Sequence, residues 1–110
     1  MADRTCTVYI SIGNSDDGLT QQRWSRFVIA VAAEVASMGK LHGSWFSNPA
    51  GPWQNACWCV EFATEEQADE AKGVAAGIAT EYGQDSIAWA VAETEFIKPE
   101  PPPDQHHGRV

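Results

Sequence analysis

The sequence predicts an α+β fold in which two helices lie on one face of a four-stranded antiparallel sheet. Three observations support this prediction. Short stretches alternate between apolar and polar residues, as strands do. Two longer stretches repeat apolar residues with the period of a helix. The predicted elements follow one another as strand, helix, strand, and then again as strand, helix, strand.

The first half of the chain contains a strand, a turn and a helix. Residues 6–12 alternate, with Val8 and Ile10 expected inward and Tyr9 outward. Residues 13–18 have the composition of a turn. Thr20 is the predicted N-cap of the first helix, and Gly39 is its expected stop. The apolar stripe of this helix comprises Trp24, Phe27, Val28, Val31, Val35 and Met38.

A hairpin follows, with strands predicted at residues 40–47 and 53–63. The proline- and glycine-containing stretch 48–52 cannot continue a ladder and forms the loop between them. Alternation through the second of these strands assigns Ala56, Trp58, Val60 and Phe62 to a core face. The opposite face then receives Trp53, Asn55, Cys57, Cys59 and Glu61.

The second helix begins at Thr64, whose capping box predicts that Gln67 reaches back toward the start of the helix. Its buried stripe is expected to include Ala68, Ala71, Val74, Ala75, Ile78 and Tyr82, with Gly83 as the stop. A fourth strand is predicted over residues 86–97. We therefore expect one domain at residues 1–97 and a flexible, proline-rich tail at 98–110.

This order of elements resembles the ferredoxin-like superfold, a βαββαβ sandwich, over residues 5–97. The resemblance implies an antiparallel sheet with strand order 4-1-3-2 and both helices on one face. It implies no activity, because this fold carries many unrelated functions.

Charge is distributed unevenly along the chain. The net charge is −8, and residues 61–95 hold nine acidic residues but only one basic residue, Lys72. Such a surface argues against direct binding to nucleic acid or to an anionic membrane. Three cysteines in no disulfide-like pattern fit a reducing compartment. The first residues lack the basic-then-apolar pattern of a signal peptide, and no apolar run approaches the length of a membrane span, so we expect neither. We expect a cytoplasmic protein.

One face of the predicted sheet has no helix over it. It should carry Tyr9, Cys57, Cys59 and Glu61, together with one alternating set from the second strand (Leu41 and Trp45, or His42 and Phe46) and one from the fourth (Trp89, or Ala88, Ala90 and Ala92). Exposing such aromatic and sulfur-bearing groups is unfavourable. A second copy, a ligand or foreign protein, or the tail could cover this face. Sheet-to-sheet homodimerisation is the favoured outcome.

Metal binding and catalysis have weaker support. Cys57 and Cys59 with His42 could begin a zinc site, but a fourth ligand would have to come from elsewhere, for example Cys6 or the tail. His42 is the only histidine inside the predicted domain, so any Ser–His or Cys–His pair must use it. We therefore predict no metal, no cofactor and no catalytic set, and expect that the protein is not an enzyme.

The favoured function is a small acidic, non-catalytic interaction module, such as a bacterial or phage-borne accessory protein that binds and inhibits or modulates a host protein. The alternative is a small-molecule or cofactor-free enzyme site in the cleft between the open face and the loop at 48–52. The predicted binding residues are Tyr9, His42, Trp45, Trp53, Asn55, Cys57, Cys59, Glu65, Glu66, Asp69 and Glu70.

Overall fold

The computed structural model describes residues 4–48, 50, 51, 53–93 and 95–102. Its elements are β1 (Cys6–Gly13), the short 3₁₀ turn η1 (Ser15–Asp17), α1 (Gln21–Met38), β2 (Lys40–Phe46), β3 (Asn55–Phe62), α2 (Glu65–Glu81) and β4 (Ala88–Ala92).

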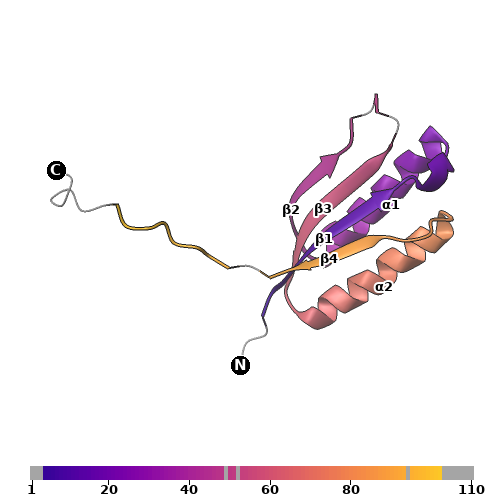
Figure 1. Ribbon diagram of the computed structural model, residues 1–110. Coiled ribbons are helices and arrows are strands. Elements are labelled where there is room, and N and C mark those ends of the chain that lie inside the picture. Colours follow the sequence, from indigo (N-terminus) through magenta and orange to yellow (C-terminus); the bar gives the residue numbers. More distant parts are fainter. Residues whose placement is uncertain (1–3, 49, 52, 94, 103–110) are drawn as a thin grey trace.

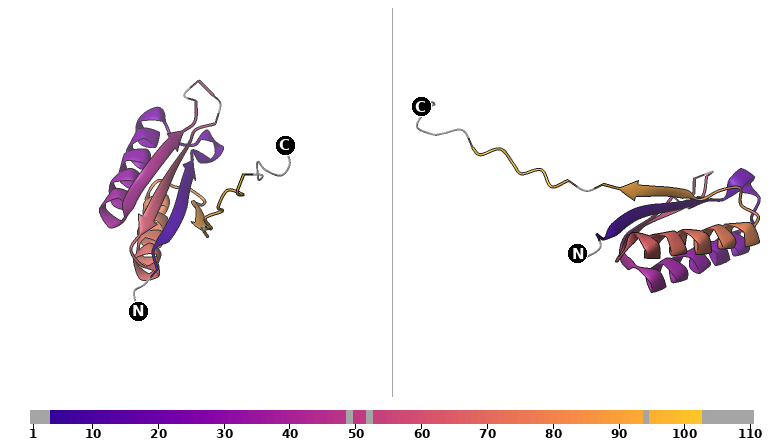
Figure 2. Two further views of the ribbon diagram at one scale, coloured as in Figure 1. Left: turned by 90° about the vertical axis from the view of Figure 1, so that its left-hand side faces the viewer. Right: turned by 90° about the horizontal axis from the view of Figure 1, so that it is seen from below.

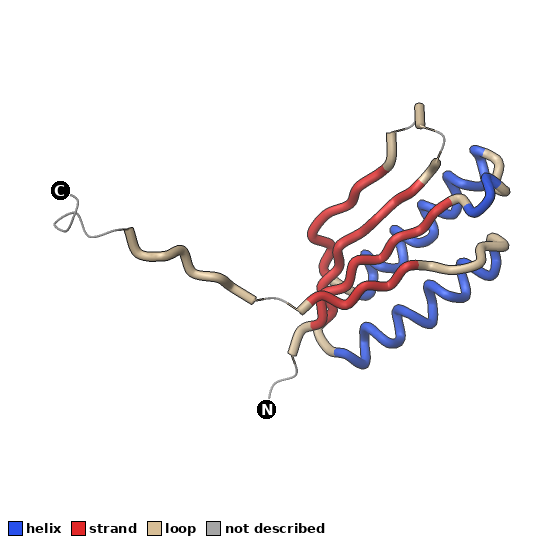
Figure 3. Tube along the Cα trace, in the orientation of Figure 1, coloured by secondary structure: helices blue, strands red, loops and turns tan. Residues whose placement is uncertain are grey.

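The four strands form one antiparallel sheet in the order β2-β3-β1-β4 (Figure 3). Both helices lie on the same side of this sheet (Figure 2). The predicted ferredoxin-like α+β fold, including its strand order, is thus confirmed. The sheet has one covered face and one face without a helix, which we call the open face.

The core lies between the sheet and the helices. Val8, Ile10, Trp58 and Phe62 point into it from the central strands and are almost completely buried. Phe27 of α1 meets them from the helical layer and stacks on Tyr82, with ring centroids 5.1 Å apart. The core set predicted from alternation in β3 is therefore confirmed. The buried residues of α2 are all alanines: Ala68, Ala71, Ala75 and Ala79.

Helix α1 begins as the sequence predicts but ends for a different reason. The Thr20 hydroxyl accepts a hydrogen bond from the Arg23 backbone N–H at 3.2 Å. Gly39 follows the last helical residue in an extended conformation, not a left-handed one. A Cβ on Gly39 would lie 2.6 Å from a methyl carbon of Val60. Close packing against β3 therefore requires glycine here.

Helix α2 is capped by Thr64, whose hydroxyl accepts from the Gln67 N–H at 3.0 Å. The Gln67 side chain reaches back to the N–H of Ala63, at 3.1 Å, one residue before the cap. Gly83, two residues beyond the helix, has a φ of +66°. This left-handed conformation is the one that glycine adopts most readily, so the predicted stop at Gly83 is confirmed.

The turn after β1 is more closely tied to the domain than its composition suggests. Asn14 is 7% exposed, and its side chain accepts from the Leu19 N–H at 2.8 Å and donates to the Leu19 carbonyl at 3.0 Å. It also donates to the Gln54 side chain at 2.9 Å. Asp16 and Asp17 have φ values of 51° and 53°. These hydrogen bonds hold the strained turn against the start of β3.

Strand β4 is shorter than the sequence predicts. It ends at Ala92, which pairs with Thr7, the second residue of β1, so beyond this pair β1 offers only Cys6 as a partner. Phe96 and Ile97, predicted to continue the strand, are 90% and 86% exposed. Residues 95–102 run away from the sheet without regular structure (Figure 1). The rest of the predicted tail, 103–110, lies outside the described residues.

Candidate functional site

The open face is built on the outward-pointing residues of β1, β3 and β4. Tyr9, at the centre of β1, lies opposite Cys59 on one side and Ala90 on the other. Ser11 and Thr7 pair in the same way with Cys57 and Glu61. Strand β4 contributes Ala88, Ala90 and Ala92, because Trp89 pairs with the buried Ile10 and turns to the helical side.

A bulge in β2 changes what this strand contributes. The pairing with β3 shifts between Leu41 and Gly43, which leaves His42 as an extra residue. As a result, Trp45 and His42 both belong to the open face: Trp45 pairs with Cys57, and His42 reaches Glu61. The expectation that β2 would supply one alternating set was wrong, because the bulge breaks the alternation. Leu41 and Phe46 pair with the core-facing Val60 and Ala56.

Two aromatic rings form the centre of the open face. Tyr9 and Trp45 stack with centroids 6.3 Å apart and planes 30° from parallel. The Trp45 ring lies over Gly43, where a Cβ would meet it at 3.5 Å, an ordinary van der Waals contact. Cys59, which pairs with both Tyr9 and Gly43, is 7% exposed. Tyr9 and Trp45 are themselves 41% and 55% exposed, so each presents a large apolar surface to solvent.

The Tyr9 phenol is coupled to the sulfur atoms beneath it. A hydrogen bond with the Cys59 side chain raises the pKa of Tyr9, and the charge that Cys59 acquires on ionisation acts in the same direction. Partial desolvation and Cys57 add smaller contributions of the same sign. The phenol is therefore neutral at physiological pH, and the centre of the open face carries no charge.

A polar pair lies on the same face of the sheet, at the bulge in β2. His42 Nε2 and Glu61 Oε1 are 2.8 Å apart, with the side chains 42% and 32% exposed. The described residues contain no group of three or more His, Cys, Asp or Glu side chains placed to hold a metal ion. Cys6 is not available to Cys57 and Cys59, because it pairs with the core-facing Phe62 and packs on the covered side.

The remaining predicted site residues are divided between other surfaces. Asn55 begins β3, with its side-chain oxygen against Gly13. Trp53 precedes β3 instead of forming part of it, and its side chain is 69% exposed. Of the predicted loop 48–52, Pro49 and Pro52 lie outside the described residues. The predicted acidic residues are all exposed on α2, in the helical layer: Glu65, Glu66, Asp69 and Glu70.

The structure thus brings together one group of the predicted residues and separates it from another. Tyr9, Trp45, Cys57, Cys59 and the His42–Glu61 pair share the open face. Helix α2, which carries the acidic residues, lies on the other side of the sheet (Figure 2).

Comparison with known proteins identifies the fold alone. No family model matches the chain, and no curated protein is significantly similar to it. Among solved structures, a hypothetical protein from Arabidopsis thaliana aligns with a TM-score of 0.59 at 10% identity, covering 90% of this chain and 96% of that one. Hydroxynitrile lyase from Passiflora edulis aligns with a TM-score of 0.52 at 12% identity, over 90% of this chain and 100% of the lyase.

A third structure, a dimeric ferredoxin-like protein from an uncultured marine organism, aligns with a TM-score of 0.44 at 11% identity, covering 88% and 96% of the two chains. Within the described part of the chain, neither helix has the length and apolar character needed to cross a bilayer.

Proposed function

We propose that this chain is a non-catalytic interaction module that binds protein through the open face of its sheet, and that its first partner is a second copy of itself. The observation that carries the proposal is the stacked pair Tyr9 and Trp45, which is uncharged, half exposed and placed at the centre of the sheet.

The surroundings of this pair favour a flat apolar contact. Ala88 and Ala90 on β4 are exposed and small, so a second sheet can approach closely beside Tyr9. Burying a large side chain contributes about 1.5–3 kcal/mol, and aromatic residues are the usual anchors of protein interfaces. The charged residues Lys40 and Glu61 pair with each other at the margin of this face, where Glu61 also contacts His42, and not at the aromatic pair.

In a symmetric dimer the open face of one copy covers the open face of the other, because each copy offers the same aromatic pair and the same alanines. The acidic residues of α2 remain on the outside of such a dimer. They are then available to steer a further partner protein with a basic surface.

The mass of the particle in solution tests the proposal. Light scattering coupled to size exclusion, over micromolar to submillimolar concentrations, should give twice the 12.0 kDa mass of one chain. Ala90→Arg places a charge in the contact and should return the mass to that of one chain. The matched control, Ala36→Arg on the exposed side of α1, should remain dimeric.

A wild-type chain of single mass at every concentration contradicts the self-association. Dimers that survive Ala90→Arg but are lost in Ala36→Arg place the contact on the helical layer and overturn the choice of face.

A further inference from the structure

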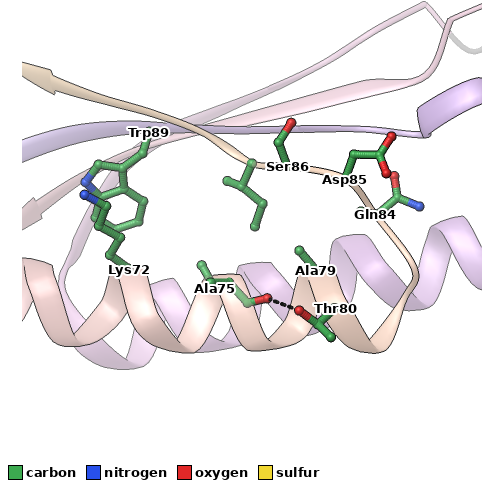
Figure 4. Close-up of a pocket in the computed structure, with 10 residues that line it drawn as sticks. Lys72, Ala75, Ala79, Thr80, Gln84, Asp85, Ser86 and Trp89 are labelled. Carbon is green, nitrogen blue, oxygen red and sulfur yellow. Dashed lines mark hydrogen bonds between the residues drawn. The ribbon is translucent and has the colours of Figure 1, made fainter.

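A cavity of about 270 Å³ lies on the helical side of the sheet, away from the open face (Figure 4). Its floor is helix α2, and its roof is the segment that leads from Gln84 into β4. Ala75 and Ala79 line the floor, and Ile87 and Trp89 line the opposite wall. The volume is just below the usual range for small-molecule pockets, so it suits one aromatic ring with a short substituent.

The cavity exists because the two helices present side chains of different size to the sheet. The buried positions of α1 are Phe27, Val31 and Val35. Those of α2 are only alanines, which leave space beneath β4. Trp89 does not collapse into that space, since its indole stacks on Phe62 with centroids 6.2 Å apart and planes 19° from parallel. The indole thus forms a flat apolar wall, and the space between it and the alanines of α2 stays open.

The two ends of the cavity differ in charge. Lys72 stands at the end beside Trp89, and Asp85 lies at the other end (Figure 4). Lys72 and Thr80 are eight residues apart on α2, which corresponds to about 12 Å along the helix. Among the described residues, the ion pair within 4.0 Å is His42–Glu61, so the Lys72 ammonium has no carboxylate partner there.

We propose that this cavity binds a small aromatic monocarboxylate. The ring lies between the alanine floor and the wall formed by Ile87 and Trp89, and the carboxylate accepts hydrogen bonds from Lys72. At the Trp89 end a cationic ring compound is disfavoured, because its charge would lie next to Lys72. A diphosphate or nucleotide is excluded by the small volume and by the carboxylate of Asp85 at the far end.

Isothermal titration calorimetry with indole-3-acetate and benzoate tests the proposal, with benzamide and benzylamine as neutral and cationic comparisons. We expect the carboxylates to bind more tightly than benzamide, and benzylamine to bind least. Lys72→Gln should weaken the carboxylates by about tenfold while leaving benzamide unchanged, since only the charge is removed. Lys40→Gln, on a strand outside the cavity, is the matched control and should change nothing.

A second variant tests the position of the ring. Ala79→Leu fills the cavity and should abolish binding of all the probes, with circular dichroism showing that the fold is retained. Absence of binding by every probe at millimolar concentration overturns the proposal, as do affinities that are equal for benzoate and benzamide. Binding that survives both Lys72→Gln and Ala79→Leu places the ligand elsewhere and also overturns it. These outcomes are independent of the mass measurement that tests self-association.

Discussion

The two faces of the sheet use the same residue types to different ends. Trp45 and Trp58 lie on the two adjacent strands of one hairpin, where they pair with Cys57 and Ser44, yet Trp58 is 1% exposed and Trp45 is 55% exposed. The covered face is packed by the helices, and its tryptophan contributes to folding. The open face stacks its tryptophan on Tyr9 with solvent above it. The comparison shows that aromatic content alone does not identify a core; the layer that covers it does.

The largest expected effect separates the two tryptophans. Trp58→Ala should lower the free energy of unfolding by about 3–5 kcal/mol, because a buried ring is replaced by a cavity. Trp45→Ala removes an exposed cross-strand contact and should cost roughly 0.2–1 kcal/mol in the monomer. Urea denaturation at low protein concentration measures both. Equal losses in the two variants would remove the distinction between the faces.

Two glycines on the covered side of the sheet should respond in opposite ways to an added methyl group. Gly39→Ala should destabilise the fold by about 1–3 kcal/mol, because its Cβ would lie 2.6 Å from Val60 and 2.9 Å from the Glu61 carbonyl oxygen. Gly73 lies in α2 with no atom near its missing Cβ. Gly73→Ala should therefore stabilise by about 0.5–1 kcal/mol. Thermal unfolding of the pair checks the opposite signs; a loss in Gly73→Ala would contradict the open space around it.

The His42–Glu61 pair on the open face should contribute less to the free energy of unfolding than these substitutions. An exposed ion pair such as His42–Glu61 contributes about 0–1 kcal/mol, and salt reduces it. A double-mutant cycle with His42→Ala and Glu61→Ala at low and high salt measures the coupling. A coupling well above this range that persists in high salt would show that the pair is shielded from solvent.

The smallest expected effect on stability comes from the ionisation of Tyr9 at alkaline pH. Because the pKa of Tyr9 is raised in the folded chain, the folded state holds this proton more tightly than the unfolded state. Its contribution to stability is therefore complete below about pH 10 and is lost as the pH rises through the folded-state pKa. Ultraviolet titration of Tyr82→Phe isolates Tyr9. Adding Cys59→Ala should lower the Tyr9 pKa, and an unchanged value would exclude the Cys59 hydrogen bond as the cause.

Much of the fold could be predicted because the deciding signals are local. Thr20 and Thr64 mark helix starts through their own hydroxyl groups, and the period-two pattern around Trp58 determines which side of β3 is buried. The length of β4 could not be read in this way. It depends on where β1 begins, which is a property of the partner strand.

The candidate site was predictable only in part. Tyr9, Cys57 and Cys59 share a face through simple alternation, as the sequence predicted. Joining His42 and Trp45 on that face required the bulge, and no residue type in β2 demands a bulge there. The cavity under β4 was missed for a similar reason. The alanines of α2 are visible in the sequence, but the space that they leave depends on Trp89 being held against Phe62.

The three free cysteines differ in burial, so their rates of alkylation measure how often different parts of the fold open. Cys57 is partly accessible on the open face, Cys59 lies buried beside Tyr9, and Cys6 is half covered on the opposite side. Burial and the neighbouring Glu65 and Asp69 raise the pKa of Cys6, which slows its attack on a thiol reagent. Alkylation of the folded single chain, as in the Ala90→Arg variant, should therefore proceed first at Cys57. The later labelling of Cys59 would time how often the aromatic pair swings aside.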